Sequence, residues 1–185
     1  MKKNLFYILI LLTSISCFQP RYELSEKEKE FNPYQIGDRL IFESNTKKLD
    51  TFYISNIDLV YNDGLGIIEY KQALRVYEGK APKENEIHDK RTFLLEICSG
   101  GSKEQTFIEL RDFIGEKQNL SDLRVKPTDK LETNFDTFED VISIKSNKSL
   151  DYDSKIYEYF WSLEKGIVRF KKGDSSIWTL KEFKR

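Results

Sequence analysis

Short runs of β-branched and aromatic residues, divided by turn residues, fill most of the chain from Gly37 onward. Apolar and polar positions alternate within these runs, so that Leu40 and Phe42 would share one face of a strand, and Phe52 and Ile54 one face of the next. A period of two is typical of a strand with one buried face. No window of about 12 residues sustains the 3.6-residue period of an amphipathic helix. The pattern therefore predicts a mainly β protein.

About nine strands are expected, each bounded by turn residues. They cover residues 39–44, 50–57, 66–77, 91–98, 105–113, 139–145, 155–162, 166–171 and 176–183. Short turns join the last four strands, which predicts an antiparallel meander. We expect an antiparallel curved sheet, a roll or a partly closed barrel, with little helix. One short helix is expected near residues 120–124, inside a polar and irregular stretch over 116–137.

The longest apolar run of the chain lies at its N-terminus. Residues 1–17 read MKKNLFYILILLTSISC, in which Lys2 and Lys3 precede eight apolar residues over 5–12. Positive residues followed by a short apolar run are typical of a secretory signal peptide. The run is too short for a transmembrane helix, which needs roughly 20 apolar residues. A short membrane anchor that is never cleaved is the alternative interpretation.

The apolar run ends in Ser-Ile-Ser-Cys over residues 14–17. This sequence resembles the lipobox of bacterial lipoproteins, in which a Cys after a small residue is lipidated and becomes the new N-terminus. Ser14 stands where Leu is commoner, and this looser form resembles lipoproteins of Bacteroidota. The resemblance implies that residues 1–16 are a lipoprotein signal peptide and that acyl chains on Cys17 anchor the protein. A disulfide between Cys17 and Cys98 is the competing use of both residues.

The residues that follow Cys17 bear on the location of the protein. In lipoproteins of Bacteroidota, an acidic run directly after the Cys marks export to the cell surface. Residues 18–21, Phe-Gln-Pro-Arg, stand in that place here. The resemblance therefore implies a cell-envelope protein that is lipid-anchored to a membrane, with the periplasmic face of the outer membrane favoured.

Residues 17–35 are expected to form a lipidated Cys and a flexible tether, ahead of a single antiparallel β domain over 36–185. The segment contains a mixed-charge run without an apolar stripe. Ser25 and Glu28 have the spacing of a capping box, which predicts at most a one-turn helix. Because about 15 extended residues reach roughly 50 Å, such a tether would hold the domain clear of lipid headgroups.

The charges of the chain almost cancel, with 30 Lys and Arg against 31 Asp and Glu. This balance excludes the basic excess that is typical of nucleic-acid binding. Cleavage before Cys17 would remove Lys2 and Lys3 and change the formal charge from -1 to -3. Two Cys and one His exclude a disulfide framework and argue against a Cys/His zinc cluster or a His-based triad. Cys98 ends an apolar run, so we expect it to be buried and inert.

The strongest pattern lies in the C-terminal third, where aromatic residues recur at strand spacing. The sequence over 157–162, 165–170 and 178–180, together with 37–42 and 50–54, resembles β-rich domains of unknown function in lipoproteins of Bacteroidota. That resemblance implies a fold and a compartment and no activity. Packing in the core or on a sheet face is the first interpretation of the aromatic residues. The second is a ligand-stacking platform formed by Tyr157, Tyr159, Trp161 and Trp178.

Three further features are weaker candidates for chemistry. Asp151 and Asp153 offer two carboxylates for calcium, but no loop of the EF type follows them, so a solvated turn is favoured. His88 lies among acidic residues and is interpreted as exposed. Gly100 and Gly101 are interpreted as a tight turn, because no phosphate-binding motif surrounds them. We therefore expect no metal and no cofactor.

Two classes of function follow from these observations. The first is a non-enzymatic, membrane-anchored envelope lipoprotein that acts in binding or assembly with an envelope partner of unknown identity. The alternative is a periplasmic carrier of a hydrophobic ligand such as a lipid, held in a half-open barrel. A hydrolase comes third, because no nucleophile has a base at usable spacing.

Overall fold

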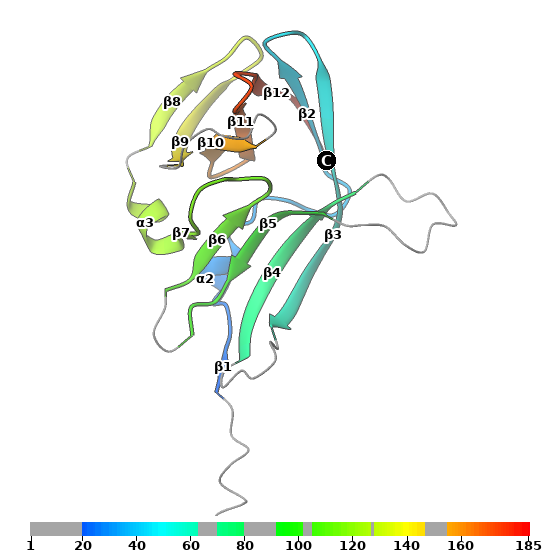
Figure 1. The fold of residues 1–185 in the computed structure, drawn as a ribbon. Coiled ribbons are helices and arrows are strands. Elements are labelled where there is room, and N and C mark those ends of the chain that lie inside the picture. The colour runs from blue at the N-terminus through cyan, green and yellow to red at the C-terminus, as the bar shows by residue number, and fades with distance from the viewer. Residues whose placement is uncertain (1–19, 63–69, 80–91, 102–104, 127, 147–154) are drawn as a thin grey trace, which may run out of the picture.

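The computed structural model describes residues 20–62, 70–79, 92–101, 105–126, 128–146 and 155–185. Within these ranges, twelve strands form one strongly curled sheet, a half-barrel seen in Figure 1. The strands are β1 (Arg21–Tyr22), β2 (Arg39–Ser44), β3 (Leu49–Asn62), β4 (Tyr70–Glu78), β5 (Thr92–Cys98), β6 (Phe107–Leu110), β7 (Gln118–Asn119), β8 (Asp129–Glu132), β9 (Thr137–Lys145), β10 (Ile156–Ser162), β11 (Gly166–Lys172) and β12 (Ile177–Lys184). Two short helices accompany them, α2 (Glu26–Lys29) and α3 (Leu120–Val125). The expected curved, mainly β fold is confirmed.

The sheet is antiparallel along its main path, whose order is β7-β6-β5-β4-β3-β2-β12-β11-β10-β9-β8. The C-terminal meander predicted from short turns is confirmed as β9 to β12. β2 lies between β3 and β12, so a strand near the start of the domain pairs with the last strand of the chain. The two halves of the sheet therefore meet at a pairing between distant parts of the sequence.

The expected alternation of buried and exposed side chains is present in β2 and β3. Leu40 and Phe42 are fully buried on one face of β2, and Phe52 and Ile54 are buried on β3. The rings of Phe42, Phe52 and Phe170 lie 5.0 to 5.8 Å apart from one another. This aromatic cluster fills the inside of the curl where the two halves of the sheet meet.

Several boundaries differ from the sequence-based prediction. β3 extends to Asn62, well beyond the expected end at residue 57. β6 ends at Leu110 instead of residue 113, because Asp112 has a φ of 53° that breaks the extended backbone. The stretch expected to be irregular contains the short strands β7 and β8 in addition to the predicted helix α3.

The segment after β6 closes one side of the curl. Phe113 forms an isolated parallel bridge to Ile156, and Tyr159 donates its hydroxyl to the carbonyl oxygen of Arg111 at 2.7 Å. The backbone nitrogen of Ile114 also donates to the carbonyl of Ile156 at 3.0 Å. These contacts join the β6 end of the sheet to β10, so the half-barrel is tied across its open side.

The prediction of a flexible tether is wrong for residues 20–35. β1 pairs with β4 in parallel, and Leu24, Phe31 and Tyr34 are 3 to 6% exposed in the hydrophobic core. The one-turn helix α2 does have the predicted capping box between Ser25 and Glu28. The helix itself has no buried residues, but the apolar residues on either side of it, Leu24 and Phe31, are buried. We call residues 20–35 the N-terminal segment.

Aromatic contacts hold the N-terminal segment inside the curl. The ring of Phe31 stacks on Trp161 with centroids 5.1 Å apart and an interplanar angle of 5°. Tyr34 meets the same indole edge-on at 6.0 Å. Such ring pairs stabilise a core beyond the area that they bury. The segment is therefore a structural part of the β domain. Across the described ranges of the chain, no helix is long and apolar enough to cross a membrane.

Candidate functional site

Two of the four aromatic residues considered as a ligand platform are core residues. Tyr159 and Trp161 are fully buried on β10, and neither ring presents a face to solvent. Trp161 is covered by Phe31, and Tyr159 packs against Phe113 and Phe170 at centroid distances of 6.0 Å. The prediction of a ligand-stacking platform is therefore wrong for these two rings, which pack in the core as the first interpretation expected.

The other two aromatic residues, Tyr157 and Trp178, are partly exposed. Trp178 lies on β12 and stacks on Phe170 with centroids 6.0 Å apart, and the ammonium of Lys172 lies 5.2 Å from its ring centre. One ring face of Trp178 is therefore covered by the core. The structure does not assemble the four aromatic residues into one surface.

Most of the remaining candidates lie outside the described ranges. Cys17, His88, Asp151 and Asp153 belong to this group, so their predictions stay predictions. Cys98 is 4% exposed at the end of β5, as expected from its apolar run. Among the residues that the structure does describe, no cluster of three or more His, Cys, Asp or Glu side chains could hold a metal ion.

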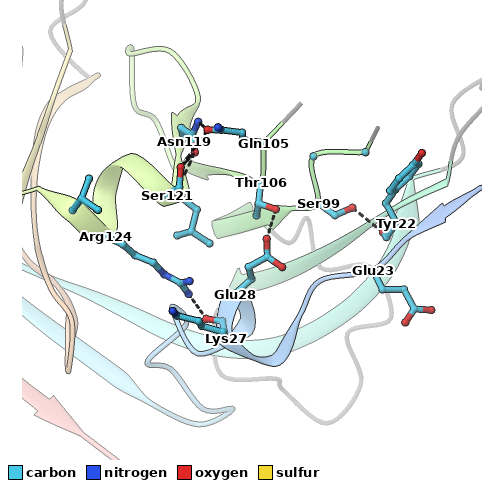
Figure 2. A pocket seen from close by; sticks show the side chains of 14 residues that line it. Tyr22, Glu23, Lys27, Glu28, Ser99, Gln105, Thr106, Asn119, Ser121 and Arg124 are labelled. Atoms are coloured by element: carbon cyan, nitrogen blue, oxygen red, sulfur yellow. Dashed lines mark hydrogen bonds between the residues drawn. The ribbon is translucent and has the colours of Figure 1, made fainter. Parts of the chain in front are cut away.

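An open groove of about 620 Å³ lies between the N-terminal segment and α3, and we take it as the candidate site. Figure 2 shows its polar side chains. The lining residues are Tyr22, Glu23, Lys27, Glu28, Ser99, Gly100, Gly101, Gln105, Thr106, Asn119, Leu120, Ser121, Arg124 and Val125. They come from three separate stretches of the sequence, the N-terminal segment, the turn after β5, and the region from residue 105 to α3.

The N-terminal wall of the groove is fixed to the sheet by hydrogen bonds. Ser99 donates its hydroxyl to the carbonyl oxygen of Tyr22 at 2.8 Å. The backbone nitrogen of Leu24 donates to the side-chain oxygen of Gln72 at 3.0 Å. Ser99 and Gln72 are both largely buried, which makes these bonds costly to break. The wall is therefore held in place on two sides of Glu23.

The opposite wall is a row of amide and hydroxyl groups at the start of α3. Asn119 caps this helix by accepting from the backbone nitrogen of Ser121 at 3.0 Å. Its side-chain nitrogen bonds to Gln105, and the Ser121 hydroxyl donates to Gln105 at 3.2 Å. Figure 2 shows these three side chains side by side at the rim of the groove. They present neutral donors and acceptors to the opening.

Two side-chain contacts span the groove. The hydroxyl of Thr106 bonds to the carboxylate of Glu28, and the guanidinium of Arg124 bonds to the carbonyl oxygen of Lys27 (Figure 2). Burial raises the pKa of the Glu28 carboxyl, but hydrogen bonds from Ser25 and Thr106 outweigh burial and hold this pKa below its usual range. Glu28 is therefore a charged acceptor at neutral pH.

This arrangement suits binding better than proton transfer. A carboxylate with a lowered pKa is a weaker base than an ordinary one, so Glu28 is poorly matched to activating the Thr106 hydroxyl. The described lining residues contain neither His nor Cys. What the groove offers is a set of hydrogen-bond donors and acceptors of both charges, among them Glu23, Lys27 and Arg124.

Sequence reasoning missed this groove. The capping box at Ser25 and Glu28 and the helix near residue 120 were both visible as local signals. Their proximity was not, because Glu28 and Thr106 are 78 residues apart and Arg124 and Lys27 are 97 apart. The interpretation of Gly100 and Gly101 as a turn agrees with the positive φ of 72° at Gly101.

The structure is a curled antiparallel half-barrel with a polar groove between its N-terminal segment and α3. Comparisons with protein-family models, with curated proteins and with solved structures found no significant match.

Proposed function

We propose that this chain is a cell-envelope lipoprotein, anchored to a membrane through acyl chains on Cys17, and that it acts by non-enzymatic binding or assembly at the groove. The envelope partner presents polar groups to the groove. The periplasmic face of the outer membrane is the favoured location, because residues 18–21 contain no acidic run. The protein has no requirement for a metal or a cofactor in this role.

The observation that carries the proposal is the polar composition of the groove, taken together with the signal-like sequence over residues 1–16. The signal-like sequence over residues 1–16 and the small residue before Cys17 support lipidation. The lining of the groove, with charged side chains of both signs and a row of amides, supports recognition of a polar partner. Two or more acyl chains supply the stable membrane attachment that one chain does not.

The anchor is tested on protein extracted from membranes of a host that processes lipoproteins. Intact mass should show a chain that begins at Cys17 and carries diacylglycerol. The Cys17→Ala variant should appear in the soluble fraction. An unmodified chain that begins near residue 17 would rule out the anchor, and a Cys17→Ala variant that stays with the membrane would point to another means of attachment.

The groove is tested by photo-crosslinking in intact cells. A crosslinker at Ser121, on the rim, should capture a defined partner, and one at the exposed Lys184 on β12 should not. Substitution of both cations by a neutral residue that can still donate to the Lys27 carbonyl oxygen, Lys27→Gln with Arg124→Gln, should strongly reduce the Ser121 product while leaving the amount of folded protein unchanged. Equal products from Ser121 and Lys184, or insensitivity to the double substitution, would contradict binding at the groove.

The alternative, a carrier of a hydrophobic ligand, draws support from the curled half-barrel. The inner face of the curl is occupied by Leu24, Phe31 and Tyr34 of the N-terminal segment and by the aromatic core. A carrier would therefore have to release this segment before a lipid could enter. Organic extraction of the purified soluble domain decides between the two: stoichiometric lipid would favour the carrier, and lipid-free folded protein would favour binding at the groove.

A further inference from the structure

One apolar and three amphipathic side chains lie near one another where β1 joins the sheet, and we call Leu59, Arg21, Tyr61 and Tyr70 the anchor-end patch. The guanidinium carbon of Arg21 lies 5.8 Å from the ring centre of Tyr61 and 6.0 Å from that of Tyr70. Leu59 is two residues from Tyr61 on β3, on the same side of the strand. In Figure 1 this is the end of the sheet where β1, the end of β3 and the start of β4 come together.

The register of β3 shows that the patch belongs to the core-facing side of the sheet. Leu59 is directly opposite Leu74, and Tyr61 is directly opposite Gln72. Opposite residues of an antiparallel pair share a face, and Leu74 and Gln72 are only 6% and 8% exposed. Leu59 is nevertheless 52% exposed and Tyr61 38% exposed. At this end of the sheet, the face that elsewhere packs against the hydrophobic core is therefore exposed at Leu59 and Tyr61.

The length of chain between Cys17 and the sheet fixes what lies beside this end. The carbonyl oxygen of Pro20 accepts a hydrogen bond from the backbone nitrogen of Tyr70 at 3.0 Å, so the fold begins at Pro20. Three residue steps separate Pro20 from Cys17, and they span at most about 11 Å. If Cys17 is lipidated, as the proposed function requires, the end of the sheet cannot move far from the lipid headgroups.

We propose that the anchor-end patch rests on the headgroup layer of the membrane that holds the Cys17 lipid. Tyr side chains favour this interface because the ring is apolar and the hydroxyl is polar. The Arg21 guanidinium, which lies beside the two rings, adds a positive charge that anionic headgroups attract. The inference rests on the proposed function and adds an orientation to it, with β1 and the end of β3 toward the membrane and the hairpin between β2 and β3 away from it.

β3 supplies a matched pair of probe sites for the test. Leu49 and Leu59 are on the same strand, are 62% and 52% exposed, and are ten residues apart, which is roughly 33 Å along a strand. An environment-sensitive nitrobenzoxadiazole label is attached to Leu49→Cys or to Leu59→Cys in the lipidated full chain. Cys98 is 4% exposed, so the parent chain without an added Cys serves as the blank.

Both labelled proteins are placed in vesicles of phosphatidylethanolamine and phosphatidylglycerol, with or without a lipid that carries a nitroxide on its headgroup. The inference predicts loss of most label emission at residue 59 and little loss at residue 49. Equal quenching at the two sites, or quenching at residue 49 alone, overturns the orientation while mass spectrometry still shows lipid on Cys17. If the mass shows no lipid on Cys17, the proposed anchor is overturned, and the orientation with it.

Discussion

The phenol oxygen of Tyr34 accepts a hydrogen bond of 2.8 Å from the backbone nitrogen of Ile167, a residue 133 positions later in the chain. Tyr34 is 3% exposed and belongs to the N-terminal segment, whereas Ile167 begins the interior of β11. Burial raises the pKa of the Tyr34 hydroxyl well above its ordinary value, so the group stays neutral. This bond fastens the start of the domain to its C-terminal meander.

The first prediction concerns that bond. Tyr34→Phe leaves the buried backbone nitrogen of Ile167 without this acceptor, so it should lower the free energy of unfolding by about 1–3 kcal/mol. Urea denaturation measures the change. The control is Tyr53→Phe, at a partly exposed ring on β3, for which we expect a change within about 0.5 kcal/mol. Equal effects of the two substitutions would contradict the role of the Tyr34 hydroxyl.

The second prediction concerns the turn between β10 and β11. Gly166 has a φ of +75°, and a Cβ there would overlap the ring and hydroxyl of Tyr34. Gly37 has a φ of +98° but open space around it. Its substitution by Ala therefore measures the cost of the backbone conformation alone, without a steric overlap. Gly37→Ala should cost about 1–3 kcal/mol, and Gly166→Ala should cost clearly more. Thermal or urea unfolding compares them, and an equal cost would mean that Tyr34 does not constrain the turn.

The third prediction separates a packed segment from a tether. Phe31→Ala removes the ring stacked on Trp161 and should destabilise the domain by about 3–5 kcal/mol. Ile36→Ala, at a side chain that is 61% exposed, should change stability by no more than about 0.5 kcal/mol. A soluble chain over residues 20–185 should unfold cooperatively in urea, and one over 36–185 should not. Cooperative unfolding of the shorter chain with unchanged stability would restore the tether interpretation.

The fourth prediction is a pH dependence at the groove. The pKa of Glu28 is lower in the folded protein than its ordinary value of 4.5. Its charge therefore stabilises the folded state above that value, and the contribution is lost as the pH falls through the folded-state pKa. The difference in unfolding free energy between wild type and Glu28→Gln should shrink on acidification. Thr106→Val removes one hydrogen bond to Glu28, so the unfolding free energy of this variant should differ from that of wild type by an amount that changes less with pH. If the difference between wild type and Glu28→Gln grows as the pH falls, the prediction is contradicted.

Local patterns were sufficient to predict most strands of this fold. The alternation in β2 predicts a strand with one buried face, and the closely spaced turns of β9 to β12 predict a meander. The structure has both. The extension of β3 to Asn62 was missed because apolar and polar residues do not alternate over residues 58–62, where Leu59, Val60 and Tyr61 follow one another. The break at Asp112 depends on a positive φ that an Asp adopts without any strong sequence signal.

The N-terminal segment and the groove could not be predicted in the same way. Leu24, Phe31 and Tyr34 are apolar residues set around a four-residue helix, which is too short to display a helical period. The partners of Phe31 and Tyr34 on β10 and β11 lie more than a hundred residues away in the sequence. The polar groove depends on the same long-range docking, so its walls carried local signals without any indication that they face each other.

The pairing of β2 with β12 has a consequence for how the chain acquires its structure. Residues 39–44 are synthesised well before their neighbour over residues 177–184. Contacts of such high sequence separation are slow to form, because a long loop must close before they contribute. Until β12 has docked, β2 has one unpaired edge, and until β10 has docked, Phe31 and Tyr34 lack their contact with Trp161. The partly folded chain therefore exposes a strand edge and aromatic surface, so the interval before these distant parts meet carries its greatest risk of aggregation.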